Sequence, residues 1–136
     1  MTRPPLALPL SLDRVLVVED DPGVQQVLNW GLSRAGVREV VVAPDGLAGL
    51  DLARSLLPDL ILSDVMLPGI SGIEMVRRLQ SEPPHLMMPV VYLTAAYQPA
   101  FGDRSPVEFG AIGALHKPVP IRELGQLLAD MLRAAR

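Results

Sequence analysis

The sequence predicts an α/β protein, a doubly wound five-stranded parallel sheet with helices on both faces. Short runs rich in β-branched residues alternate along the chain with segments of helical spacing, and a repeated strand–helix pattern is typical of this fold class. The runs are continuously apolar, as expected for parallel strands buried on both faces. With 136 residues, 49% of them hydrophobic, the chain has the size of one domain with a single core.

Five apolar runs are the predicted strands, and the fifth is weaker than the others. They are Val15–Val18, Val40–Val42, Leu60–Leu62, Val90–Leu93 and Ala114–His116.

Four of the segments around these strands have the apolar spacing of a helix. The first begins at Pro22, a residue suited to the opening turn, and stops before Gly36, which suits the end of a helix. The second covers about 45–56, the third contains Ile73, Val76 and Leu79, and the last runs over about 121–134.

The stretch between the fourth and fifth strands predicts a different structure. Residues 98–113 contain two prolines and three glycines, which disfavour a long regular helix. An irregular loop followed by a short helix near 106–111 is expected, so the fourth helix of the fold is irregular.

Composition and the N-terminal residues restrict the remaining possibilities. Prolines break residues 1–13, which are expected to form a flexible arm outside the core, with residues 14–136 as the domain. The chain has no cysteine, which excludes disulfides, zinc thiolate sites and iron–sulfur clusters. No apolar run has the length of a membrane span, and a net charge of −3 argues against direct nucleic-acid binding. A cytoplasmic protein is expected.

Polar residues follow four of the strands at the point where each one ends. They are Glu19-Asp20-Asp21, Ser63-Asp64, Thr94-Ala95-Ala96 and Lys117-Pro118. The carboxyl ends of parallel strands meet at one edge of the sheet, where ligands bind in folds of this class. Each group alone has an ordinary structural explanation, such as capping a helix or shaping a turn. Their joint placement on different strands favours a common site.

The chemistry of these groups points to a hard metal ion and to phosphate. Clustered carboxylates repel one another unless a cation neutralises them. Oxygen ligands without His or Cys favour Mg²⁺ or Mn²⁺. A carboxylate can also act as a nucleophile and form an aspartyl phosphate, with the metal, an ammonium group and a hydroxyl stabilising the transferred group.

Four stretches in this order resemble the receiver domain of two-component response regulators. They are VLVVEDDPGVQQVL, PDLILSDVMLPGISGIEMVRRL, PVVYLTA and GALHKPV. The resemblance covers about Arg14 to Arg133 and implies a flavodoxin-like fold with strand order 2-1-3-4-5.

The resemblance assigns Asp64 as the phosphoacceptor and as a metal ligand. Asp20 corresponds to a direct magnesium ligand, Glu19 to one that assists through water, and the main-chain carbonyl of Met66 to a further ligand. Asp21 is expected to cap the first helix.

Thr94 resembles the switch hydroxyl that contacts the phosphoryl group, and Lys117 the lysine that pairs with it. Ala95 has the small side chain that phosphoryl access requires. Pro118 is the candidate for a cis peptide bond, because the Lys-Pro bond is often cis in such domains.

Two features depart from the family pattern. Ala114 stands where the family commonly has Tyr or Phe, the aromatic side chain that swings inward on activation. Tyr97 or Phe109 could substitute for it sterically. The irregular stretch before the fifth strand lies where receivers usually have a regular helix that contributes to output.

The leading hypothesis is a phosphorylatable switch that takes a phosphoryl group from a histidine kinase or phosphotransfer protein onto Asp64 with Mg²⁺. It would catalyse only its own phosphorylation and dephosphorylation and relay the change as a conformational signal. A second copy of the chain, forming a homodimer, is a further candidate partner. The alternative is a receiver-like scaffold that signals by protein contacts largely without phosphorylation. A hydrolase of the haloacid dehalogenase type is disfavoured, because Met66 stands where such enzymes have a second Asp. A flavin-binding flavodoxin is disfavoured as well, because the acidic residues after the strands would repel the phosphate of the flavin.

Overall fold

A five-stranded parallel sheet forms the centre of the molecule, in the order β2-β1-β3-β4-β5. The computed structural model describes residues 10–96 and 100–135. The strands are β1 (Arg14–Val18), β2 (Glu39–Ala43), β3 (Leu60–Asp64), β4 (Val90–Thr94) and β5 (Gly113–His116). Each predicted strand is present, extended by at most two residues at either end, and the predicted fold class and strand order are confirmed.

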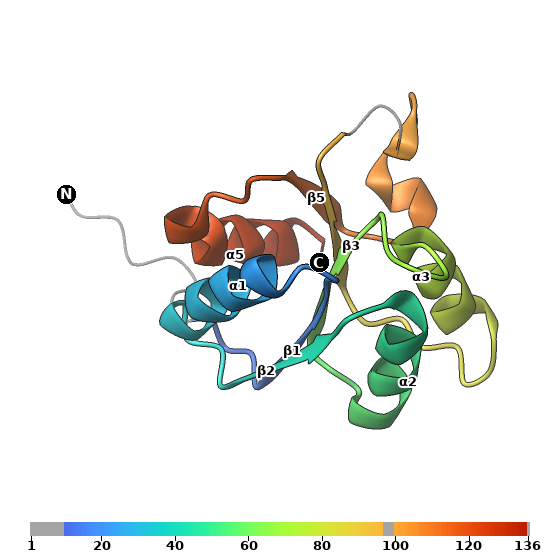
Figure 1. Cartoon of the computed structure of the whole chain (residues 1–136), viewed down its shortest axis with the longest axis horizontal. Helices are drawn as coiled ribbons and strands as arrows, with labels where there is room; N and C mark the ends of the chain where they lie inside the picture. Colours follow the sequence, from blue (N-terminus) through green and yellow to red (C-terminus); the bar gives the residue numbers. More distant parts are fainter. Residues whose placement is uncertain (1–9, 97–99, 136) are drawn as a thin grey trace.

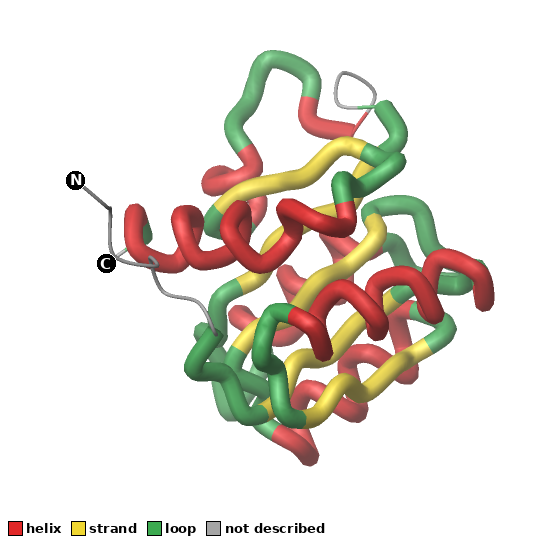
Figure 2. Tube along the Cα trace, turned by 90° about the vertical axis from the view of Figure 1, so that its left-hand side faces the viewer, coloured by secondary structure: helices red, strands yellow, loops and turns green. Residues whose placement is uncertain are grey.

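Helices cover both faces of this sheet (Figure 1; Figure 2). They are α1 (Pro22–Arg34), α2 (Gly46–Leu56), α3 (Gly72–Ser81) and α5 (Leu124–Ala134), with two 3₁₀ helices, η1 (Pro106–Phe109) and η2 (Ile121–Glu123). Helices α1 and α5 lie on one face, and α2 and α3 on the other (Figure 1). None of the helices in the described part of the chain is both long and apolar enough to cross a membrane.

The side chains of β1 explain why the predicted strands are apolar throughout. Val15 and Val17 pack in the core on the side of α1 and α5. Leu16 and Val18, which point to the opposite face, pack in the core on the side of α2 and α3. All four are fully buried. Both faces of the sheet therefore carry a core, and a strand inside it has no solvent-facing side.

Helix termini follow the local signals in the sequence. Asp21 caps α1, since its side chain accepts hydrogen bonds from the amides of Gly23 and Val24 at 2.7 and 3.2 Å. Gly36, just past the end of α1, has φ +106°, a conformation that glycine adopts readily. The expected capping role of Asp21 is confirmed, and the cap fixes the start of α1 directly after the acidic residues.

Between β4 and β5, the described residues 100–112 contain no long regular helix, as the sequence predicts. The short helix expected near 106–111 is the 3₁₀ helix η1, with Ser105 as its cap and Gly110 (φ +86°) at its end. Tyr97 lies outside the described residues. Phe101 is buried and packs on Tyr92 and Phe109, with ring centroids 5.6 and 5.8 Å apart.

The expected N-terminal arm, residues 1–13, lies largely outside the described residues. Its described end corrects one part of that expectation, since Leu10 is only 4% exposed and belongs to the core beside α1. The Leu10 amide donates to the carbonyl of Ala35 at 2.7 Å, and the Asp13 amide donates to Asp59 Oδ2 at 2.9 Å. Prolines earlier in the segment do not prevent a leucine close to β1 from burying its side chain.

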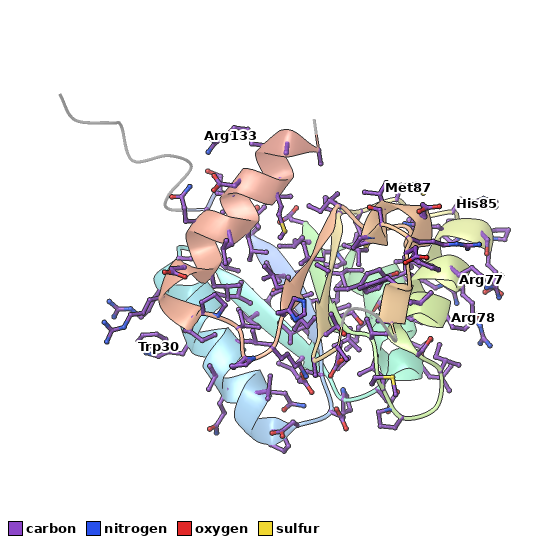
Figure 3. The ribbon with its side chains drawn as sticks, turned by 90° about the horizontal axis from the view of Figure 1, so that it is seen from above. Trp30, Arg77, Arg78, His85, Met87 and Arg133 are labelled. Carbon is purple, nitrogen blue, oxygen red and sulfur yellow. The ribbon has the colours of Figure 1, made fainter. Side chains whose placement is uncertain are left out.

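Polar and aromatic side chains occupy the outer surfaces of the helices. Trp30 lies on the outside of α1, and Arg77 and Arg78 lie on the outside of α3 (Figure 3). Trp30 is 51% exposed, with the Arg34 guanidinium 5.0 Å from the ring centroid.

Candidate functional site

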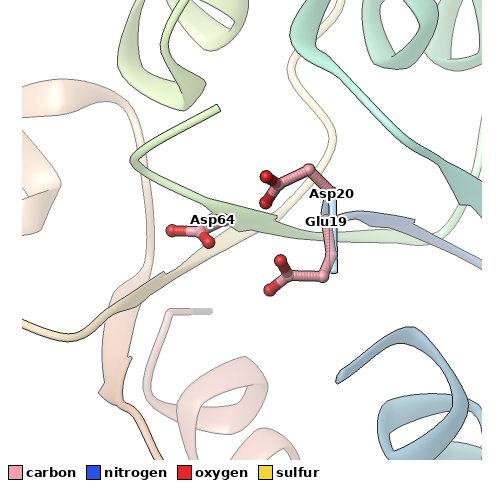
Figure 4. Close-up of side chains that lie close together, drawn as sticks. All are labelled: Glu19, Asp20 and Asp64. Carbon is pink, nitrogen blue, oxygen red and sulfur yellow. The ribbon is translucent and has the colours of Figure 1, made fainter. Parts of the chain in front are cut away.

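Three carboxylates converge at the carboxyl edge of the sheet. Glu19 and Asp20 follow β1, and Asp64 ends β3; each offers an oxygen within 4.8 Å of the others. Their side chains point into a common space (Figure 4). Glu19 and Asp64 are 1% and 6% exposed, whereas Asp20 is exposed. The site therefore has two buried carboxylates and a third at its solvent side.

Sheet topology explains this convergence. Strands β1 and β3 are neighbours, and Val18 is in register with Ser63, so the next residues along each strand, Glu19 and Asp64, come side by side. Between β1 and β3 the chain passes through α1, β2 and α2, so Glu19 and Asp64 are far apart in sequence although they lie side by side. The sequence indicates only that Glu19 and Asp64 each come at the end of a strand. The parallel pairing of β1 with β3 is what places the two residues together.

Lys117 connects the two buried carboxylates. Its ammonium nitrogen lies 2.6 Å from Glu19 Oε1 and 2.6 Å from Asp64 Oδ2. Burial opposes the charged ammonium, but the hydrogen bonds to Asp64 and Glu19 outweigh it and raise the pKa of Lys117 above its ordinary value. The amine is therefore a fixed positive charge at neutral pH.

Glu19 has the opposite balance. Burial raises the pKa of this carboxyl group, and the raised value persists although Lys117 and the Asp21 amide stabilise the charged form. The Asp21 amide donates to Glu19 Oε2 at 3.1 Å. Both carboxylate oxygens of Glu19 thus have donors within the protein. A cation at the site would favour the ionised form further.

Lys117 reaches the site from the end of β5. Its amide donates to the carbonyl of Thr94 at 2.9 Å, which continues the pairing of β5 with β4. The peptide bond from Lys117 to Pro118 is cis, as the resemblance implied. A second cis bond, Pro83-Pro84, lies in the described chain after α3 and was not expected from the sequence.

The remaining expected site residues line a cavity of about 440 Å³ beside Asp64. Met66, Thr94, Ala95 and Lys117 contribute to its wall. The Thr94 hydroxyl donates to the carbonyl of Ala96 at 3.0 Å and accepts from the Ala96 amide at 3.1 Å. The Met66 amide donates to Asp64 Oδ1 at 3.1 Å, while the Met66 side chain is 78% exposed. The structure thus brings Met66, Thr94, Ala95 and Lys117 together with Asp64 around one cavity.

Residues that sequence reasoning did not select also shape the site. Ser71 and Ile73, from the start of α3, and Ala100 line the same cavity. A Cβ atom on Gly72 would lie 2.1 Å from the carbonyl oxygen of Asp64, so the close approach of α3 to the site requires glycine at this position. In the sequence, the contact between α3 and the end of β3 is signalled only by the Ser71-Gly72 pair that precedes the helical spacing of α3.

Ala114 lies in β5 opposite Tyr92 of β4 and packs beside the aromatic cluster of Tyr92, Phe101 and Phe109. Tyr92 is fully buried, and its hydroxyl donates to the carbonyl of Phe109 at 2.6 Å. The aromatic side chains of this region therefore come from β4, from Phe101 in the segment after it and from η1, and position 114 in β5 carries only a methyl group.

The fold and the site define a class of protein. A doubly wound parallel sheet presents a buried carboxylate, an acidic pair, an ammonium group and a hydroxyl at one edge, a set of groups found in proteins that handle phosphate with a divalent cation.

Comparison with known proteins identifies the family. Residues 15–129 match the response regulator receiver domain model, and the chain belongs to this family. It is 36% identical over 120 residues to the alkaline phosphatase synthesis transcriptional regulatory protein PhoP of Bacillus subtilis, covering 88% of this chain and 48% of that protein. It is 38% identical over 122 residues to the transcriptional regulatory protein AfsQ1 of Streptomyces coelicolor, covering 88% and 51%. The chain thus spans about half the length of these curated relatives.

Solved structures agree with this assignment. The chemotaxis response regulator CheY4 of Vibrio cholerae has a TM-score of 0.78 with 30% identity, covering 89% of this chain and 99% of that one. A response regulator from Chloroflexus aurantiacus has a TM-score of 0.76 with 33% identity, covering 89% and 98%. The chain is a receiver domain of two-component signalling, a signalling module rather than an enzyme that turns over an external substrate.

Proposed function

We propose that the domain accepts a phosphoryl group on Asp64 from a phosphohistidine of a histidine kinase or phosphotransfer protein. The observation that carries the proposal is the pairing of Asp64 with Lys117 beside Glu19 and Asp20. A carboxylate oxygen of Asp64 attacks phosphorus, so a P–O bond forms while the P–N bond breaks. The electron pair of the broken bond stays on the imidazole nitrogen of the donor.

Lys117 and Thr94 stabilise the transferred group. The ammonium of Lys117 is already held beside Asp64, so it lies next to the charge that develops on the phosphoryl oxygens. The Thr94 hydroxyl lines the same cavity and exchanges its bond with Ala96 for one with a phosphoryl oxygen. The small side chain of Ala95 leaves access to Asp64. Hydrolysis by water then breaks the P–O bond to Asp64, restores the carboxylate and releases inorganic phosphate.

A magnesium or manganese ion fits the acidic residues. Asp20 and Asp64 would bind it directly, Glu19 would assist through water, and the main-chain carbonyl of Met66 would complete the protein ligands. The donor set consists of oxygen atoms, which suits these hard cations. When bound, the ion neutralises charge on the phosphoryl oxygens. Lys117, which holds Glu19 and Asp64 together, keeps the two buried carboxylates in place for it.

The test uses beryllofluoride, a phosphoryl analogue, and the variant Asp64→Asn. In the presence of Mg²⁺, beryllofluoride is expected to shift amide resonances of residues around the cavity in the native protein, and to leave those of Asp64→Asn unchanged. Acetyl phosphate is expected to add mass to the native protein alone. Equal responses of the two proteins would refute the role of Asp64.

A scaffold function is the second candidate, and Ala114 is the observation that favours it. Without an aromatic side chain at this position in β5, the usual inward swing is not available, and Tyr92, Phe101 and Phe109 already fill the space next to it. Under this alternative, beryllofluoride shifts only resonances at the cavity, and those of η1 and β5 stay in place. Shifts that extend to η1 would support the switch.

A further inference from the structure

We propose that Gln25 is a positioning residue that holds Asp20 in place for the metal ion, an inference that rests on the proposed role of Asp20 as a ligand. Gln25 lies in the first turns of α1. Its side-chain amide donates to the main-chain carbonyl of Glu19 at 2.6 Å, and its own main-chain amide donates to the carbonyl of Asp21 at 2.9 Å. One residue thus bonds the carbonyls of the residues directly before and after Asp20.

The first of these bonds acts on Asp20 through covalent geometry. The carbonyl of Glu19 and the amide nitrogen of Asp20 belong to one planar peptide group. Holding the Glu19 oxygen therefore fixes the orientation of the plane from which the Asp20 side chain extends. The second bond holds the next carbonyl along the chain, so rotation about the Asp20 backbone is restrained from both sides.

Asp20 needs such a restraint more than the other two carboxylates do. The carboxylates of Glu19 and Asp64 are buried and bonded to Lys117. The Asp20 side chain is exposed, and within the described residues no hydrogen bond or ion pair fixes its carboxylate. The backbone is consequently the part of Asp20 that contacts within the protein hold in place.

The carbonyl of Glu19 also has few other possible donors. It lies one residue beyond β1, which ends at Val18, and the pairing with β2 reaches Glu19 only through its amide, which donates to the carbonyl of Ala43 at 3.0 Å. Helix α1 opens with Pro22, which has no amide hydrogen to offer. The cap of α1 is supplied by Asp21, so Gln25 is not required to start the helix. Its side chain instead supplies the missing donor at the acidic turn.

The neighbouring Gln26 provides a matched control. It lies on the same helix, is exposed and forms no side-chain hydrogen bond with the described residues. Gln25→Leu and Gln26→Leu make the same chemical change, and only the first removes the donor to Glu19.

Calorimetric titration of the metal-free proteins with Mg²⁺ tests the proposal, with circular dichroism confirming that each variant is folded. Gln25→Leu is expected to bind Mg²⁺ about tenfold more weakly than the wild type, and Gln26→Leu is expected to bind it as the wild type does. The phosphorylation rate of Gln25→Leu with acetyl phosphate is expected to recover at saturating Mg²⁺. Equal affinity of the two leucine variants would overturn the role of Gln25.

Backbone nitrogen relaxation in the metal-free state supplies a readout independent of activity. The Asp20 amide is expected to have a lower order parameter in Gln25→Leu than in Gln26→Leu. Identical order parameters would overturn the proposal and leave the phosphoacceptor role of Asp64 untouched. Absence of Mg²⁺ binding in the wild type would instead overturn the proposed metal site together with the role of Gln25.

Discussion

The ammonium nitrogen of Lys117 lies 2.6 Å from Asp64 Oδ2, although 53 positions separate the two residues in the chain. The same nitrogen lies 2.6 Å from Glu19, 98 positions away. Of the twelve basic residues in the sequence, Lys117 is the single lysine. A compact ammonium fits between two buried carboxylates with three donors in a small volume, whereas a guanidinium is a broad planar fork.

Lys117→Arg is therefore expected to keep its charge and lose function. The guanidinium cannot occupy the position of the ammonium without displacing Glu19 or Asp64. The rate of phosphorylation by acetyl phosphate should fall about a hundredfold, the scale for losing one well-placed donor to a developing negative charge. Phosphorus NMR of the aspartyl phosphate measures this rate. Arg122→Lys, a charge-conserving change in η2, is the control, and a normal rate in Lys117→Arg would contradict the prediction.

The ion pairs of Lys117 predict how stability depends on pH. Its pKa is raised from 10.5 in the folded protein, so the stabilisation is complete below pH 10.5 and is lost as the pH rises through the raised value. In metal-free urea unfolding, Lys117→Met is expected to be less stable than the wild type, by a constant margin from neutral pH up to the onset of lysine titration. The margin should shrink above pH 10.5. A margin that grows with pH in this range would show that the sign is wrong.

Mg²⁺ is expected to stabilise the folded protein through Asp20. A ligand that binds only the folded state contributes about 2.7 kcal/mol at a hundred times its dissociation constant. The midpoint of thermal unfolding should therefore rise with Mg²⁺ in the wild type and change far less in Asp20→Asn. Asp103→Asn, an exposed acidic residue in the loop before η1, should respond as the wild type does. Equal shifts in all three proteins would point to nonspecific ion binding.

Gly72 is predicted to be intolerant of even one methyl group. A Cβ atom there would lie 2.1 Å from the Asp64 carbonyl oxygen and 2.9 Å from Ser63 Oγ. Gly72→Ala must move α3 away from the end of β3, at a cost of about 3 kcal/mol in the free energy of unfolding. Urea denaturation measures the loss, and beryllofluoride binding reports whether Asp64 has shifted. An alanine variant of unchanged stability and binding would contradict this contact.

Tyr92→Phe removes one buried hydrogen bond and leaves the ring in place. The hydroxyl donates to the Phe109 carbonyl at 2.6 Å, and burial raises the pKa of Tyr92 so that the phenol remains a donor. Loss of this bond is expected to cost about 1–2 kcal/mol in the free energy of unfolding. Amide exchange should rise in η1, which the bond ties to β4, and stay constant in α1. Unchanged amide exchange in η1 would show that the hydrogen bond from Tyr92 to Phe109 does not stabilise η1.

Local patterns in the sequence predict the elements of the fold. Continuous apolar runs mark the strands because helices cover both faces of the sheet; β3 and β4 are buried throughout, whereas the edge strands β2 and β5 are only partly buried. Asp21, Pro22 and Gly36 mark the ends of α1 through their own backbone chemistry. Glycines and prolines after β4 predict the irregular segment and η1 for the same reason. Such signals depend on a residue and its near neighbours, so they can be read without knowledge of the fold.

The site could be predicted in part, because residues that follow parallel strands must gather at one edge of the sheet. That rule brings Asp64, Asp20, Thr94 and Lys117 together, and the resemblance to receiver domains gives each a role. It does not reveal that Lys117 bonds Glu19 as well as Asp64, because that contact depends on the distance between side chains from β1, β3 and β5.

Other features were decided by the tertiary structure alone. Leu10 lies in the core although prolines precede it, since a surface for its side chain exists only once α1 has packed. Gln25 carries no signal that separates it from Gln26, and the orientation of α1 alone turns one toward the Glu19 carbonyl and the other toward solvent. By itself the sequence determined which residues form strands, caps and the acidic edge, because those depend on local backbone chemistry and burial. Which side chains meet was decided by packing, since a contact between distant residues exists only when the elements that carry them have assembled.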